Sequence, residues 1–162
     1  MQLRAYRPDD VPALIRLFRD TIRTVNLRDY TPDQVRAWAP DEIDETRWRE
    51  RLAAQQVVVA ESEGEVVGFC SWTPEGYLDF LYVHAAFQRK GIATTLYAAA
   101  EKALRSTGVK RIYAHASITA QPFFLRQGFS IVEHRVVDIR GSKLSHAVVD
   151  KFFGRASSGL AT

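Results

Sequence analysis

The sequence predicts one α/β domain of the α+β type, with a sheet of about seven strands flanked by helices. Segments with apolar residues at helical spacing alternate with short runs rich in β-branched and aromatic residues, which indicate strands. Turn residues separate the two kinds of segment. The chain has 162 residues, of which 46% are hydrophobic and 25% charged, which is ordinary for a globular protein with one buried core. These observations favour a single domain over residues 1–153.

The first third of the chain predicts a strand followed by three helices. Residues 2–7 alternate in polarity and indicate the strand. Helical spacing then follows for Val11, Leu14, Ile15, Leu17, Phe18 and Ile22. A second helix is expected to begin after Thr31, an N-cap residue, with Pro32 at its first position. A third short helix is expected over residues 44–54.

The remainder predicts six more strands and two more helices. The strands are expected over residues 57–60, 66–72, 77–83, 111–116, 129–139 and 143–153. The helices are expected over residues 92–106 and 119–127, each closed by a glycine. Neither an internal repeat nor a linker divides these elements. Residues 154–162 are small and polar, and we expect a disordered tail there.

Composition excludes several classes of protein. The single cysteine, Cys70, excludes an internal disulfide framework, and its strand neighbours indicate a buried apolar role. Cys70 and the four scattered histidines show no zinc-ligand spacing, so no metal is expected. Residues 1–7 contain no apolar signal core, and no run approaches the roughly 20 apolar residues of a membrane span. We therefore expect a cytoplasmic protein without membrane association.

The charge distribution gives little indication of a nucleic-acid partner. The net charge is +3, and its clearest cluster is Arg16, Arg19 and Arg23 on the first predicted helix. Such a cluster favours a solvated helix face, because nucleic-acid-binding domains carry a stronger basic stripe. We expect no nucleic-acid binding.

The segment after the strand over residues 77–83 has the features of a pyrophosphate site. It contains a short basic loop with one glycine, and a helix begins directly after it. The first turn of a helix offers backbone N–H groups without partners and the positive end of the helix dipole. Arg89 and Lys90 add charge, and Gly91 allows phosphates to approach the backbone closely.

This loop resembles the acetyl-CoA-binding motif Gln/Arg-x-x-Gly-x-Gly/Ala of the GCN5-related N-acetyltransferase (GNAT) family, with Gln88, Gly91 and Ala93 at its fixed positions. A second segment, residues 116–129, resembles the family's helix and Gly-Phe strand entry after the fifth strand. The order of elements over residues 2–153 also matches. The resemblance implies the acyl-CoA N-acyltransferase fold with a mixed central sheet, and it is strongest to small bacterial members whose family name fixes no substrate.

The resemblance implies direct transfer of acetyl from acetyl-CoA to a primary amine of a small molecule or a protein. The loop would hold the pyrophosphate, and backbone N–H groups of the strand before it would bind the pantetheine arm and polarise the thioester carbonyl. The residues assigned to the cofactor are Leu81, Tyr82, Val83, Gln88, Arg89, Lys90, Gly91, Ile92, Ala93, Thr94, Phe123, Phe124 and Arg126. The alternative is a non-catalytic acyl-CoA-binding or sensor domain on the same fold.

Acetyl transfer also needs a base for the amine and a proton for the leaving thiolate. Asp79 is an acid in an apolar strand and is the first candidate for the base; a hydrogen-bonded structural role is the alternative. Strand alternation would place it on one face with Tyr77, Leu81 and Val83, unless a bulge breaks that parity. His115 is a weaker candidate, since a lone histidine on a buried strand is more often a core residue.

One departure from the family concerns the leaving group. Phe124 stands where many members carry a tyrosine general acid. We expect Phe124 to pack against the pantetheine or the core, and Ser117, Tyr82 or water to supply the proton.

The acceptor pocket is expected between the first helices and the last hairpin. Tyr30, Trp38 and Trp48 could form an aromatic wall for an aromatic or cationic amine, or could be the apolar side of two short helices. The two long last strands could support pairing between subunits, so a homodimer is a further expectation.

Overall fold

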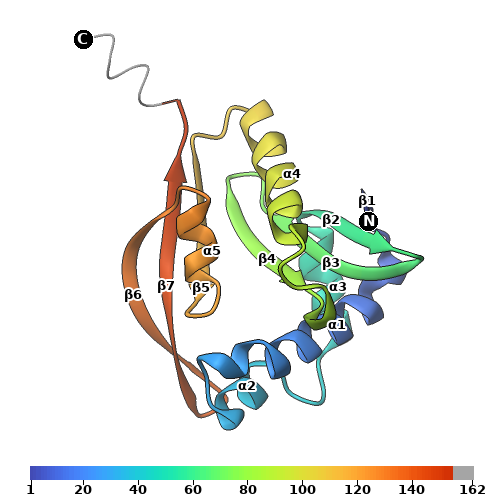
Figure 1. Ribbon diagram of the computed structural model, residues 1–162, viewed down its shortest axis with the longest axis vertical. Helices are drawn as coiled ribbons and strands as arrows, with labels where there is room; N and C mark the ends of the chain where they lie inside the picture. Colours follow the sequence, from blue (N-terminus) through green and yellow to red (C-terminus); the bar gives the residue numbers. More distant parts are fainter. Residues whose placement is uncertain (155–162) are drawn as a thin grey trace.

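The computed structural model describes residues 1–154 and contains a mixed sheet of seven strands in the order β1-β2-β3-β4-β5-β7-β6 (Figure 1). All neighbouring strands are antiparallel except β4 and β5. The strands are β1 (Gln2–Ala5), β2 (Gln56–Ser62), β3 (Glu65–Trp72), β4 (Tyr77–Val83), β5 (Arg111–Ser117), β6 (Ser130–Ile139) and β7 (Ser142–Phe152). The predicted number of strands is confirmed. The disordered tail predicted over residues 154–162 lies outside the described residues from residue 155 onward.

Residues 1–154 contain five α-helices that cover the sheet, and the local sequence explains where α2 and α3 begin. They are α1 (Val11–Thr24), α2 (Pro32–Trp38), α3 (Glu45–Ala53), α4 (Ile92–Ser106) and α5 (Gln121–Arg126). Thr31 and Gln34 cap α2 reciprocally, each side chain accepting a hydrogen bond from the other's backbone N–H. Asp44 caps α3 through the N–H of Arg47. None of the helices within residues 1–154 is long and apolar enough to cross a membrane.

Helix α5 is shorter than the sequence predicts. We expected it over residues 119–127, but it begins at Gln121 and ends at Arg126. The carbonyl and the hydroxyl oxygens of Ser117 both accept a hydrogen bond from the N–H of Ala120. These bonds hold residues 117–120 in a turn, which delays the start of the helix.

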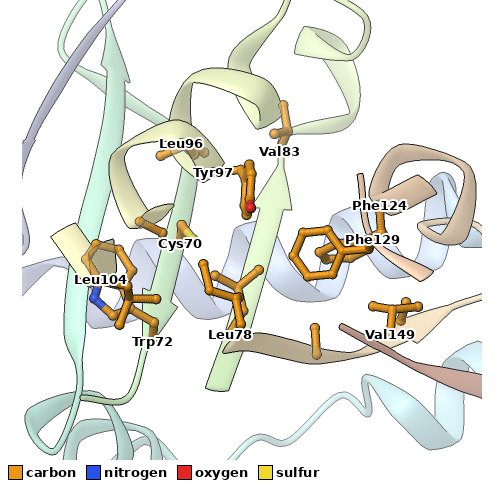
Figure 2. Close-up of a cluster of buried hydrophobic side chains, with 14 of the residues drawn as sticks. Cys70, Trp72, Leu78, Val83, Leu96, Tyr97, Leu104, Phe124, Phe129 and Val149 are labelled. Atoms are coloured by element: carbon orange, nitrogen blue, oxygen red, sulfur yellow. The ribbon is translucent and has the colours of Figure 1, made fainter. Parts of the chain in front are cut away.

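One hydrophobic core lies between the sheet and helices α4 and α5, which are on the near side in Figure 1. Figure 2 shows Tyr97 of α4 directed toward the sheet near Cys70, with Phe124 and Phe129 lying together farther along the sheet. The hydroxyl of Tyr97 donates to Glu101, which also binds the ammonium of Lys151 at 2.9 Å. Cys70 is fully buried, and burial raises the pKa of its thiol, which argues for the predicted apolar role.

The second core lies on the other face of the sheet, under α1 and α3. Its centre is a cluster of aromatic rings, in which Phe18 of α1 and Trp48 of α3 approach Phe80 of β4. The two helices are therefore fixed by large apolar contacts to the strand that leads into the loop over residues 84–91, called the phosphate loop below.

A bulge at Asp79 changes which side chains of β4 share a face. In the β3–β4 register Ser71 faces Phe80, but Trp72 faces Leu78, so Asp79 is an extra residue. As a result Leu78 belongs to the core under α4, whereas Phe80 belongs to the core under α1 and α3. The alternative left open in the sequence analysis is therefore the one observed, because the bulge breaks the parity that would place Tyr77, Asp79, Leu81 and Val83 on one face.

Candidate active site

A cleft of about 640 Å³ opens where β4 and β5 diverge. The two parallel strands pair only at Tyr77–Tyr113 and Leu78–Ala114, and no pairing continues beyond these residues. The start of α4 and helix α5 line one side of the cleft, and the end of α1 with the following turn lines the other. Residues of β4, of β5 and of the phosphate loop therefore face one common space.

The phosphate loop presents the unpaired N–H groups that the sequence predicts. Gly91 is the N-cap of α4 with φ of 79°, a left-handed conformation that suits glycine, and Arg89 is also left-handed with φ of 60°. Among the described residues, none accepts a hydrogen bond from the backbone N–H groups of residues 88–94. These groups and the dipole of the fifteen-residue helix α4 form a site suited to an anion.

The side chain of Gln88 makes a hydrogen bond within the phosphate loop. Its side-chain amide donates to the carbonyl oxygen of Val83 at 2.6 Å, and the hydroxyl of Thr21 on α1 donates to the same oxygen at 3.2 Å. These two bonds attach the phosphate loop and α1 to the end of β4. Gln88 therefore helps to hold the loop and also lines the cleft, and its contact with the cofactor stays a prediction.

The backbone of β4 directs free N–H groups into the cleft. His84 donates to the carbonyl of Val67, so Val83 and Gly68 form a non-hydrogen-bonded pair in the register. By alternation, Leu81 is in the next such pair, and the N–H and C=O groups of both residues point away from β3. Because β5 has diverged, the N–H groups of Leu81 and Val83 have no partner strand.

Helix α5 supplies an apolar wall with one cation. Phe124 is 4% exposed, packs at 5.0 Å between ring centroids against Phe129, and also lines the cleft. Phe123 and Arg126 line the cleft beside it. Ser117 lines the cleft as well, but its hydroxyl oxygen already accepts the bond from Ala120.

Asp79 lines the cleft with its carboxylate fully engaged. Arg51 binds both of its oxygens, with Nε to Oδ2 at 2.6 Å and Nη2 to Oδ1 at 2.5 Å, and the Gln55 amide donates to Oδ2 at 2.7 Å. The Asp79 side chain is only 3% exposed. This arrangement corresponds to the structural alternative considered for this residue.

His115 lies on β5 in the cleft and forms a pair with His146 of β7. Nδ1 of His115 is 3.1 Å from Nε2 of His146. His115 is exposed and lines the cleft, whereas His146 is half-buried. The weaker of the two base candidates from the sequence is therefore the one with accessible ring atoms.

The comparisons with known proteins agree with this geometry. The model of the acetyltransferase (GNAT) domain family matches residues 26–153. The chain belongs to the GNAT family. The Escherichia coli (strain K12) protein YafP, described as an uncharacterized N-acetyltransferase, is 38% identical over 142 residues, which cover 88% of this chain and 89% of YafP.

Two solved structures show how closely the GNAT fold is reproduced. A GCN5-related N-acetyltransferase from Rhodopseudomonas palustris superposes with a TM-score of 0.90 at 31% identity, covering 94% of this chain and 95% of that one. PaiA N-acetyltransferase from Thermoplasma acidophilum, solved in complex with coenzyme A, superposes with a TM-score of 0.72 at 16% identity, covering 94% and 98% of the two chains. The protein is therefore an N-acetyltransferase with the acyl-CoA N-acyltransferase fold.

Tyr30, Trp38 and Trp48, the aromatic residues expected to line the acceptor pocket, do not all lie together in this GNAT domain. Trp38 lines the cleft and contacts Tyr30 edge-to-face. Tyr30 is 6% exposed, and its hydroxyl bonds to the carbonyl of Ser145 and to the N–H of Ile118. Trp48 is 8% exposed and lies in the core under α3. Of the three residues predicted for the aromatic wall, only Trp38 lines the cleft. Trp48 is buried where α3 packs on the sheet, and Tyr30, in the segment before α2, is buried in the same core.

The sequence analysis missed Asn26 and Thr119, two polar residues that line the cleft. Asn26 is 6% exposed, and the buried hydroxyl of Thr119 has no hydrogen-bond partner among residues 1–154. The analysis also missed His146, which contacts His115 and whose position depends on the β5–β7 register. No local sequence signal marks these residues, since their roles follow from distant segments meeting.

Proposed function

We propose that this protein transfers an acetyl group directly from acetyl-CoA to a primary amine of a small molecule or a protein. The observation that supports this most is the position of two sets of unpaired N–H groups in one cleft. Those of residues 88–94 suit the pyrophosphate, and those of Leu81 and Val83 suit the pantetheine arm and the thioester carbonyl. The coenzyme A complex of the PaiA structure is consistent with this assignment.

Different residues would bind the pyrophosphate, the pantetheine arm and the thioester carbonyl of acetyl-CoA. Arg89, Lys90 and Arg126 add positive charge at the pyrophosphate end. The apolar surface of Phe123 and Phe124 borders the pantetheine path. Free N–H groups on β4 stabilise the negative charge that develops on the carbonyl oxygen as the amine attacks.

No metal is required by this proposal. Among residues 1–154 there is no cluster of three or more His, Cys, Asp or Glu side chains that could hold one. The amine attacks the thioester carbon and the bond to sulfur breaks. The proton that the newly bonded nitrogen loses then passes to the thiolate through Ser117, Tyr82 or water. We place the reaction in the cytoplasm, where acetyl-CoA is available.

The second candidate function is a non-catalytic acyl-CoA-binding domain. Phe124 favours it, because the tyrosine hydroxyl that many family members use as an acid is absent from the buried ring position. Both functions require binding of acetyl-CoA, but only the transferase turns it over. Binding and turnover must therefore both be measured.

The first experiment is isothermal titration of acetyl-CoA into wild type, Gly91→Asp and Gly91→Asn. Asparagine tolerates the left-handed conformation about as well as aspartate and has the same size, and the space around Gly91 is open. We expect micromolar binding for wild type, a loss of at least 10-fold for Gly91→Asp, and a clearly smaller loss for Gly91→Asn. Absence of binding by wild type would contradict the proposal.

The second experiment measures thiol release from acetyl-CoA with L-lysine, spermidine, kanamycin and a peptide with a free amino-terminal alanine. Amine-dependent release with mass-spectrometric detection of the acetylated product supports the transferase. Tight acetyl-CoA binding without acetylation of any of these amines would favour the binding domain.

A further inference from the structure

We propose that His115 takes the proton from the acceptor ammonium and that His146 is a positioning residue that fixes the tautomer of His115. This inference rests on the proposed function and names its proton acceptor. It assigns the task to a pair of side chains on β5 and β7 and leaves Asp79 with a structural role.

The two histidines are diagonal neighbours on one face of the sheet. In the β5–β7 register His115 faces Val148 and Ser117 faces His146, so the imidazoles lie two positions apart on adjacent strands. Their ring centroids are 5.2 Å apart, and Nδ1 of His115 lies 3.1 Å from Nε2 of His146. A contact of this length between ring nitrogens is a hydrogen bond when one nitrogen carries a proton and the other does not.

Two tautomer assignments fit this contact, because either ring nitrogen can be the donor. Leu144 is the backbone group that tends to raise the pKa of His146, as a carbonyl beside a ring N–H would. We therefore assign the proton of His146 to Nδ1, the nitrogen that does not face His115, which leaves Nε2 as an acceptor. His115 must then donate from Nδ1, so its Nε2 has a free lone pair. Within residues 1–154 this Nε2 has no hydrogen-bond partner, and His115 lines the cleft.

The surroundings keep this lone pair available near neutral pH. Partial desolvation by the neighbouring side chains lowers the pKa of His115 first of all; Arg135 on β6 lowers it further, and Asp79 on β4 opposes them. Burial, His115 and Arg135 lower the pKa of His146 in the same way. Tyr77 of β4 packs edge-on to His115 at 5.8 Å, and Arg51 of α3 neutralises the carboxylate of Asp79.

Asp79 is poorly arranged for the same task. Its two oxygens accept three short hydrogen bonds from Arg51 and Gln55, and its side chain is 3% exposed. Proton transfer to Asp79 would require breaking a two-point ion pair, which also holds α3 to β4.

The step balances without any further reactant. One proton of R–NH3⁺ passes to Nε2 of His115, and the freed lone pair forms the N–C bond as the C–S bond breaks. The sulfur keeps the electron pair and takes up the second proton that the nitrogen loses. The imidazolium returns its proton to solvent.

The kinetic test follows kcat/KM from pH 5 to 9.5 for the amine of the panel above with the highest turnover. We expect wild-type kcat/KM to rise with pH through a titration below the usual histidine value of about 6.5 and then to level. His115→Gln should lower kcat/KM about 100-fold at pH 7 and remove this titration. His146→Leu should lower it about 10-fold and shift the titration, and His146→Gln, which keeps an acceptor, should recover most of the loss. His134→Gln, an exposed histidine of β6, is the matched control.

The structural test needs no amine. Imidazole ¹⁵N shifts of the free protein should show a protonated Nδ1 and an unprotonated Nε2 for His115, and His146→Leu should shift this ring toward the other tautomer. Unchanged shifts in His146→Leu, or a His115→Gln pH profile parallel to wild type, would overturn the inference while leaving the proposed function intact. Acetyl-CoA binding without turnover of any amine would overturn both.

Discussion

The hydroxyl oxygen of Tyr30 accepts a hydrogen bond of 2.9 Å from the backbone N–H of Ile118. The same hydroxyl donates to the carbonyl of Ser145 at 2.6 Å, so one side chain joins the segment before α2 to the β5–α5 loop and to β7. The cleft therefore has one side held by a single buried phenol, and burial raises the pKa of that phenol.

Tyr30→Phe should lower the free energy of unfolding by about 1–3 kcal/mol, because it leaves the N–H of Ile118 and the carbonyl of Ser145 without this partner. Urea denaturation at pH 7 measures the change. Tyr113→Phe is the matched control, since the hydroxyl of Tyr113 makes no hydrogen bond among residues 1–154. Equal losses in the two variants would show that the Tyr30 bridge contributes nothing particular.

Asp10 should make stability depend on acidic pH. The guanidinium of Arg4 binds both carboxylate oxygens, and this bonding holds the pKa of Asp10 below its ordinary value of about 4. A group whose pKa is lowered on folding contributes stability above its unfolded pKa, and this contribution is lost as the pH falls toward the folded pKa. Asp10→Asn should therefore reduce stability at pH 7 by about 1–3 kcal/mol and flatten its dependence between pH 5 and 2.

Urea denaturation at several pH values measures the Asp10 effect. Asp9→Asn is the matched control, because Asp9 is exposed and forms no ion pair within the described residues. A pH dependence of Asp10→Asn that matches wild type would show that another carboxylate dominates acid unfolding.

Gly68 fixes the distance between β3 and the start of α4. A Cβ at this position would lie 3.0 Å from Cδ1 of Leu96 and 3.0 Å from the backbone oxygen of Tyr82. Gly68→Ala should thus lower stability by about 1–3 kcal/mol and weaken acetyl-CoA binding, since α4 must move and its N-terminus moves with it.

Denaturation and titration calorimetry on the same samples measure the two effects of Gly68→Ala. Gly64→Ala serves for comparison, because its Cβ meets open space and only its φ of 79° is unfavourable, which costs about 1 kcal/mol. Gly64→Ala should leave acetyl-CoA binding unchanged; a similar weakening in both variants would argue against the close approach as the cause.

Local sequence signals predicted the parts of the site that depend on neighbouring residues. The phosphate loop is an example, because a glycine, two cations and a helix start lie within one short segment around Gly91. The capping of α2 by Thr31 is another. Both depend on bonds between residues a few positions apart, so the pattern in the sequence is sufficient.

The rest of the site depends on register and packing, which single segments do not contain. The bulge at Asp79 requires the pairing with β3, and the contact of His115 with His146 requires the pairing with β7. Trp38 and Trp48 both suit the apolar side of a short helix, and only the packing of α3 on the aromatic cluster buries Trp48. The edge strand β6 carries exposed Val132 and Val136, and the homodimer stays a prediction.

Phe124→Tyr should not raise the turnover number at any pH. The coenzyme A thiol is a fair leaving group, since an ordinary thiol has a pKa of about 8.5, and a nearby acid therefore adds little. The ring is 4% exposed and packs against Phe123 and Phe129, so an added hydroxyl must be accommodated in a closely packed site, and stability should fall by about 1–3 kcal/mol.

The measurements for Phe124→Tyr are kcat from pH 6 to 10 and urea denaturation at pH 7. Phe152→Tyr is the control for stability, because Phe152 is 49% exposed and a hydroxyl there reaches water. If kcat of Phe124→Tyr exceeded that of wild type above pH 8.5, where the thiolate leaves unprotonated, protonation of sulfur would be limiting. The tyrosine found in many family members would then be a missing acid in this chain rather than a dispensable one.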